Sequence, residues 1–247
     1  MKTLASYNIK GGVGKTSTAV NLAALAAAEG WRTLLWDLDP QGAATYLFRI
    51  RPRVKGGAQS LISGRRDVEL AIKSTDVDGL DLLPADFSYR HMDLALDDAK
   101  RPDRRLRRIL APLAAEYDLV VLDCPPSASL VSEAIFTAAD LLLVPLIPAP
   151  LSARTYDQLT EFVDTADGRR PLIRAFFSMV DGRKRLHAEM IRDLRENRDT
   201  ILAAAVPASA EIERMGLRRE PVVVSAPRSP AAAAYAALWQ ECRPLVT

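Results

Sequence analysis

The stretch Lys10-Gly11-Gly12-Val13-Gly14-Lys15-Thr16 decides the fold of this chain. It lies between an apolar run at 3–8 and a helical pattern at 15–29. Glycines in that position let backbone N–H groups turn inward onto phosphate groups, and the N-terminus of the helix adds its positive end. Lys15 is then placed to reach the β- and γ-phosphates, and the Thr16 hydroxyl to bind Mg²⁺. The context therefore predicts a phosphate-binding loop that holds ATP and Mg²⁺.

The loop departs from the ordinary P-loop pattern at two positions. Ile9 stands where the pattern has a glycine, and Lys10 replaces a neutral residue with a second cation. A glycine-rich turn with chance lysines is the competing interpretation, and the agreement of strand, loop and helix disfavours it. The predicted nucleotide-binding residues of the loop and the first helical turn are Gly11, Gly12, Val13, Gly14, Lys15, Thr16 and Ser17.

The rest of the chain alternates apolar runs with helical patterns, which is typical of βαβ units around a parallel sheet. We expect an α/β fold: a single P-loop NTPase domain over 1–247, with a mostly parallel, twisted sheet covered by helices on both faces. The candidate strands are 3–8, 32–37, 80–83, 118–123, 140–146, 172–179, 200–206 and 221–224.

The amino-acid composition limits the class to which the protein can belong. The chain is 49% hydrophobic and 26% charged, which suits a globular protein with a buried core. Its net charge of +2 does not by itself indicate a nucleic-acid binder. The first eight residues leave no room for a signal peptide before the glycine loop, and the two cysteines lack a metal-ligand spacing. We therefore expect a cytoplasmic protein.

Two further segments place acids at strand ends. Leu119-Val120-Val121-Leu122-Asp123 is an apolar strand ending in a carboxylate, the arrangement that holds Mg²⁺ through water. Trp36-Asp37-Leu38-Asp39 places two acids after the second predicted strand. Capping of the following turn is an alternative role for Asp37.

Together these segments resemble the ParA/MinD family of deviant Walker A ATPases. Lys10 to Thr16 is similar to the family's KGGVGKT box, 37–42 to its DxDPQG switch I, and 123–126 to its DxPP switch II. The resemblance implies that Lys10 crosses a dimer interface to the partner's nucleotide, that Asp39 positions or activates the attacking water, and that Asp37 lies near the magnesium shell. The implied catalytic residues are Lys10, Lys15 and Asp39, and the implied metal residues are Thr16, Asp123 and Asp37.

The resemblance extends loosely through the C-terminal third. Residues 178–183 look like the strand end that approaches the adenine, which implies roles for Met179 and Asp181, and Pro207 looks like the loop on the other side of the base. Many members have DNA-binding arginines straight after that proline, but this chain reads Ala208-Ser209-Ala210-Glu211. A rearranged basic patch and simple solvated loops are both open, and the candidate DNA-binding residues are Arg183, Lys184, Arg185, Arg214, Arg218 and Arg219.

A second helix is predicted from Pro102, with Arg104, Arg105, Arg107 and Arg108 on its outer face. These arginines could meet a polyanion, although a solvated outer stripe is the ordinary interpretation.

The resemblance implies a positioning ATPase that forms a homodimer with ATP and Mg²⁺ and binds DNA non-specifically. A cargo-associated partner protein would stimulate its hydrolysis, and the ATPase would be associated with the nucleoid. The sequence does not name the cargo, which could be a plasmid, a chromosome or a protein complex such as carboxysomes. A MinD-like membrane switch is the alternative, but the residues 239–247 include Pro244 and only one basic residue, which argues against membrane binding. A reductase related to nitrogenase iron protein would need two cluster cysteines per subunit near the dimer axis, and only Cys124 could lie there.

Overall fold

The fold is built on one eight-stranded sheet with the order β3-β4-β2-β5-β1-β6-β7-β8. The computed structural model describes residues 1–65, 67–165 and 169–247. All strand pairs are parallel except β3 with β4, which confirms the α/β prediction with a mostly parallel sheet. The strands are β1 (Lys2–Ser6), β2 (Thr33–Asp37), β3 (Lys73–Ser74), β4 (Leu80–Leu83), β5 (Leu119–Asp123), β6 (Leu141–Leu146), β7 (Leu172–Val180) and β8 (Ile201–Pro207).

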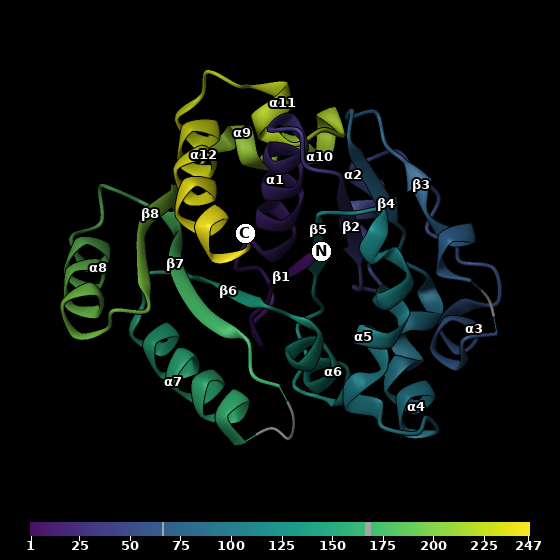
Figure 1. Ribbon diagram of the computed structural model, residues 1–247. Coiled ribbons are helices and arrows are strands. Elements are labelled where there is room, and N and C mark those ends of the chain that lie inside the picture. Colours follow the sequence, from purple (N-terminus) through teal and green to yellow (C-terminus); the bar gives the residue numbers. More distant parts are fainter. Residues whose placement is uncertain (66, 166–168) are drawn as a thin grey trace.

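Helices connect these strands and cover both faces of the sheet (Figure 1). The α-helices are α1 (Lys15–Ala28), α2 (Ala43–Leu47), α3 (Gly57–Ser63), α4 (Met92–Asp97), α5 (Arg105–Leu110), α6 (Leu130–Ala138), α7 (Pro150–Thr165), α8 (Arg185–Asn197), α9 (Ala210–Glu213), α10 (Met215–Arg218), α11 (Val222–Ser225) and α12 (Pro230–Cys242). Short 3₁₀ helices span Val68–Ala71, Phe87–His91, Pro102–Arg104, Ala111–Ala115 and Arg243–Leu245.

Two hydrophobic cores form because side chains of a buried strand alternate between the two faces of the sheet. Leu35 and Val121 face a core that also holds α1, α2 and α12. Leu34 and Val120 face the opposite core, which holds α3 to α8. Every residue of β1 after Lys2, and every residue of β2, β5 and β6, is buried, so the centre of the sheet is a rigid support for the loops at its edge.

The structure corrects one predicted strand. Residues 221–224 form not a strand but part of the helical turn α11, and Pro221 caps it. Val222 is fully buried, while the N–H of Val223 donates to the Asn21 side chain on α1. A run of four apolar residues does not distinguish a strand from a buried helical turn, so packing against α1 decided the outcome.

Two smaller differences concern short elements. The two-residue strand β3 was not predicted, because neither Lys73 nor Ser74 is apolar or buried. The helix expected from Pro102 is a short α-helix, α5, between two 3₁₀ turns. None of the helices in the described ranges is long and apolar enough to cross a bilayer.

Candidate nucleotide-binding site

The central strands bring the predicted site residues together at the carboxyl edge of the sheet. Strand β5 lies between β1 and β2, with Asp123 in register with Ser6 on one side and Asp37 on the other. The phosphate-binding loop follows β1 directly and leads into α1, whose N-cap is Gly14. The loop and the strand-end acids therefore meet where open α/β sheets bind ligands.

The loop conformation depends on glycine and on Asn8. Gly12 and Gly14 have φ angles of 70° and 93°, a region that glycine adopts without strain. The Asn8 side chain accepts a hydrogen bond from the N–H of Lys10 at 2.9 Å and donates to the Pro145 carbonyl at the end of β6 at 2.9 Å. Asn8 thus ties the loop to the neighbouring strand. No sequence pattern indicated this role, since Asn8 and Pro145 are separated by more than half of the chain.

Lys15 is buried at the start of α1, whereas Lys10 is exposed. The Lys15 ammonium donates a hydrogen bond to the Lys10 carbonyl at 2.8 Å, so it lies folded against its own loop. Burial lowers the pKa of Lys15, and the nearby Asp123 and Asp39 charges oppose that shift. A buried ammonium beside inward-turned backbone N–H groups favours a bound polyphosphate.

Asp123 is fully buried, and neither oxygen of its carboxylate has a hydrogen-bond partner within the described part of the chain. Burial, with the charge of Asp37, raises the pKa of Asp123 well above its usual range. A buried carboxylate without partners is costly unless a cation compensates it. Thr16 lies close enough to this carboxylate to affect its pKa. The residues present therefore fit a magnesium ion held between Thr16, Asp123 and a nucleotide.

Asp37 and Asp39 have different surroundings. The Asp37 carboxylate accepts hydrogen bonds from the Thr45 N–H at 2.8 Å and the Thr45 hydroxyl at 2.7 Å, so it fixes the start of α2. Burial raises the pKa of Asp37 to about 6. Asp39 is half-buried and accepts one bond, from the N–H of Gln41 at 2.9 Å. The capping alternative for Asp37 matches this geometry, and Asp39 is the acid with spare acceptor capacity beside the loop.

A pocket on the other side of α1 suits a nucleobase. Its lining includes four residues of the predicted nucleotide site, namely Gly14, Ser17, Met179 and Pro207. Ser178, from the predicted segment 178–183, and Val206, next to Pro207, also line it. The sequence did not indicate the other lining residues, which are Ala208, Ser209, Ile212, Glu213 and Tyr235. Tyr235 comes from α12, so only the tertiary fold could place it here. Asp181 is absent from the lining, and its carboxylate binds the Arg183 guanidinium at 2.9 Å.

Most of the candidate DNA-binding residues already have partners within the chain. Arg183 pairs with Asp181, Arg185 with Glu189, and both Arg214 and Arg218 with Glu211, at 2.7–2.9 Å. Lys184 is exposed and has no acidic partner among the described residues. Each pair neutralises a charge that a phosphate contact would need.

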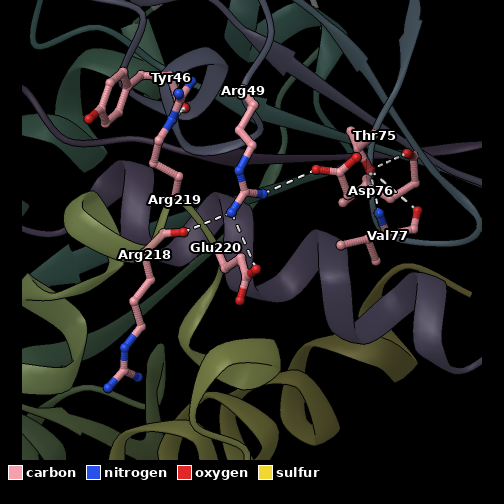
Figure 2. Close-up of polar contacts among 9 residues, drawn as sticks. Tyr46, Arg49, Thr75, Asp76, Val77, Arg218, Arg219 and Glu220 are labelled. Atoms are coloured by element: carbon pink, nitrogen blue, oxygen red, sulfur yellow. Dashed lines mark hydrogen bonds and ion pairs between the residues drawn. The ribbon is translucent and has the colours of Figure 1, made fainter.

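Arg219 belongs to a separate network that joins α2 to α10. Figure 2 shows the Arg219 side chain over the Tyr46 ring, where its guanidinium carbon is 4.4 Å from the ring centroid. The Arg49 guanidinium binds Asp76 at 3.1 Å on one side and Glu220 at 3.3 Å on the other. Tyr46 in α2 and Arg49 just after it are therefore attached to Arg219 and Glu220, the two residues that follow α10.

We expect the replacement Asp123→Asn to raise the stability of the nucleotide-free protein and to abolish its ATP hydrolysis. The nucleotide-free protein should gain about 1 kcal/mol, because asparagine removes a negative charge buried beside Asp37, while its amide stays as unpartnered as the carboxylate. That gain corresponds to a rise of a few degrees in unfolding temperature at this chain length. Magnesium-dependent ATP hydrolysis should be lost. Calorimetry and a phosphate-release assay measure the two effects, and hydrolysis at the unmodified rate would exclude Asp123 from the metal site.

Comparison with known proteins places this arrangement in a family. A family model described as an AAA domain matches residues 1–174. The sporulation initiation inhibitor protein Soj of Bacillus subtilis is 30% identical over 246 residues, which is 97% of both chains. The chromosome partitioning protein ParA of Caulobacter vibrioides is 31% identical over 249 residues, covering 98% of this chain and 93% of the relative.

A solved structure shares both the fold and a nucleotide complex. A cobyrinic acid a,c-diamide synthase from Mycobacterium smegmatis, solved with an ATP analogue and magnesium, is 26% identical, with a TM-score of 0.84 over 97% of this chain and 93% of the other. The two relatives Soj and ParA match nearly the whole chain. This chain belongs to the ParA/MinD family of P-loop ATPases.

Proposed function

We propose that this protein is a ParA-type positioning ATPase that dimerises on binding ATP and Mg²⁺, binds DNA non-specifically, and positions or segregates a cargo. Hydrolysis stimulated by a cargo-associated partner protein would release the dimer. The relatives named for chromosome partitioning support the general function. The dimer, the DNA and the partner are parts of the proposal.

Lys10 is the observation that carries the dimerisation step. Its side chain is exposed, and it has no acidic partner among the described residues, although it sits in a loop built for phosphates. Its backbone is fixed by Asn8 and its carbonyl by Lys15, so the side chain extends from a rigid support. A cation with no partner in its own subunit suits the phosphates bound by a second copy.

The roles of the other residues follow from their surroundings. Lys15 and the loop N–H groups would bind the phosphates, and the pocket between Ser17, Met179 and Tyr235 would hold the base. Asp39 would orient the attacking water, since Asp37 is already committed to Thr45. Magnesium, when bound, would neutralise phosphate charge in a site that Asp123 and Thr16 fit. This set accounts for ATP binding and slow hydrolysis by one subunit.

The structure disfavours the membrane alternative. Helix α12 packs on β8 and α1, and its Tyr235, Leu238, Trp239 and Cys242 are buried. An amphipathic membrane helix needs a free apolar face, and α12 uses its apolar face in the core. We therefore propose that the protein works in the cytoplasm on the nucleoid.

The test combines assembly with DNA binding. We expect the Asp39→Ala variant with ATP and Mg²⁺ to form a stable dimer in light scattering and to retard duplex DNA of any sequence at low salt. ADP should give neither result, because it lacks the γ-phosphate that Lys10 would contact across the interface. A monomer at saturating ATP would refute ATP-dependent dimerisation. A dimer that does not bind DNA at low salt would refute association with the nucleoid.

A further inference from the structure

The segment 100–108 has an unusual concentration of positive charge. It holds six basic residues and one acid, whereas the rest of the chain holds 27 basic and 30 acidic residues. A protein with a net charge of +2 thus carries most of its positive excess in one short segment around α5. A field of this kind is local, and it attracts anions despite a nearly neutral chain.

Packing fixes the direction in which these charges point. Leu106, Leu110 and Leu113 are buried in the core, which fastens α5 and the following turn to the body of the protein. Arg107 and Arg108 are exposed and make no ion pair within 1–65, 67–165 and 169–247, and Arg104 has only the adjacent Asp103 at 3.4 Å. The outer face of α5 therefore presents guanidinium groups that the chain leaves largely uncompensated.

A hollow of about 290 Å³ lies on this face, and its described lining contains no acid. It is lined by Arg104, Arg107, Arg108 and Ala111. Guanidinium groups present several donors in a planar fork, which matches the geometry of phosphate oxygens. The lining of the hollow therefore suits an anion.

Arg105 adds to the positive field without reaching into this hollow. Its guanidinium lies against Gly64 at the end of α3, where a Cβ would come within 2.8 Å of it. Its Nε is buried without a hydrogen-bond partner among the described residues. Burial and the charge of Arg108 lower the pKa of Arg105. An anion bound beside Arg108 would relieve this crowding of like charges.

The lining residues favour a phosphate backbone over an acidic protein segment. Ala111 is the one apolar residue of the described lining, so a peptide side chain would gain little there. The larger hollow on the other side of Arg108, about 480 Å³, has apolar residues such as Leu61 but also Asp67 and Glu69. An acidic peptide reaching into it would meet repulsion from those two carboxylates. Phosphates that stay on the side of Arg104 and Arg107 avoid them.

We propose that the phosphates of duplex DNA bind the α5 face through Arg104, Arg107 and Arg108. This inference rests on the proposed function, which requires the dimer to bind DNA. It differs from the candidates at 183–185 and 214–218, because the arginines there already have acidic partners at 2.7–2.9 Å, which offset part of their charge. Figure 1 shows α5 beside α4 and α6, well apart from α9 and α10 at the top of the view. The two candidate surfaces can therefore be altered separately.

The test compares two variants that lose the same charge. One carries Arg104→Ala, Arg107→Ala and Arg108→Ala, and the other carries Arg183→Ala, Lys184→Ala and Arg185→Ala. Both are measured with ATP and Mg²⁺ in the Asp39→Ala background, by fluorescence anisotropy of a labelled duplex over a range of salt concentrations. We expect the α5 variant to bind DNA at least about 100-fold more weakly near 0.1 M salt, with a smaller salt slope, because up to three phosphate contacts per subunit are lost. The control should change by less than about 3-fold.

Further measurements separate charge from folding. The variant with Arg104→Lys, Arg107→Lys and Arg108→Lys should recover most of the affinity, since lysine keeps the charge. Basal ATP hydrolysis, measured without the Asp39 change, should stay within about 2-fold in all three variants, because α5 lies outside the nucleotide site.

Three results would overturn the inference. If the α5 alanine variant binds DNA normally and the control does not, DNA binding stands and the loop at 183–185 carries it. If the α5 variant loses affinity for polyglutamate and not for DNA, the arginines serve an acidic protein. If the unmodified dimer does not bind DNA at low salt, the DNA part of the proposed function falls together with this surface.

Discussion

Replacing Asp39 with alanine should reduce ATP hydrolysis by about 100-fold or more and leave ATP binding within a few fold. A carboxylate that positions or deprotonates an attacking water contributes about 10²- to 10⁴-fold to rate. Asp39 stands beside the phosphate-binding loop, and its carboxylate accepts a single backbone hydrogen bond, from Gln41. Its other acceptor positions can therefore hold a water. Phosphate release gives the rate, and titration with a fluorescent ATP analogue gives the affinity.

The matched control for this prediction is Asp39→Asn. Asparagine keeps the acceptor for the Gln41 N–H and thus the turn that follows β2, but it lacks the negative charge and the basicity. If Asp39→Asn is as slow as Asp39→Ala, the carboxylate acts on the water. If it hydrolyses ATP normally, Asp39 serves only the turn, and the assignment is wrong.

Replacing Lys15 with alanine should weaken ATP binding by at least about 100-fold, which corresponds to about 2.7 kcal/mol. The ammonium is buried at the loop, and the loss of one partner of a desolvated charge pair costs about 2 to 5 kcal/mol. Within the described residues of the nucleotide-free protein the Lys15 ammonium donates only to the Lys10 carbonyl, so the folded state should tolerate its loss. Isothermal titration calorimetry measures the affinity, and thermal unfolding checks the fold.

Lys10→Ala is the informative comparison. Lys10 is exposed, and among the described residues its side chain makes no hydrogen bond or ion pair; the backbone bonds of Lys10 are ones that alanine keeps. A monomer of this variant should bind ATP with nearly unmodified affinity and fail to dimerise in light scattering. Equal loss of ATP binding in the two variants would show that Lys10 belongs to its own subunit's site and does not act across an interface.

Some features of the site could be predicted from the sequence and others could not. The difference is whether a feature depends on neighbours in the sequence or on distant residues. The phosphate-binding loop could be predicted because strand, glycines, lysine and helix follow one another within a short stretch, so local sequence specifies the geometry. Asp123 could be predicted as a strand-end acid for the same reason. The lack of hydrogen-bond partners around the Asp123 carboxylate, within the described residues, could not be predicted, because it depends on β1 and β2 lying on either side of β5.

The C-terminal part shows the limit of local patterns. Met179 and Pro207 were predicted and line the pocket beside α1, but Asp181, only two residues from Met179, is turned to Arg183. Tyr235 completes the pocket from α12 without any motif of its own. For the basic residues at 183–185 and 214–218 the sequence left a basic patch and solvated loops both open. In the structure the four arginines Arg183, Arg185, Arg214 and Arg218 have acidic partners, some of them within a few residues.

The sequence by itself determined the α/β class, the phosphate-binding loop and seven of the eight strands, because these depend on side-chain periodicity and on contacts between near neighbours. Only the tertiary structure decided which hydrogen-bond partners each acid has, where the pocket beside α1 lies, and which arginines make no ion pair within the described residues. Those properties depend on burial and on charge pairs between different elements. Two residues with the same chemistry, Asp37 and Asp39, have different surroundings because the fold places Thr45 against the Asp37 carboxylate, while the Asp39 carboxylate accepts only the Gln41 N–H among the described residues.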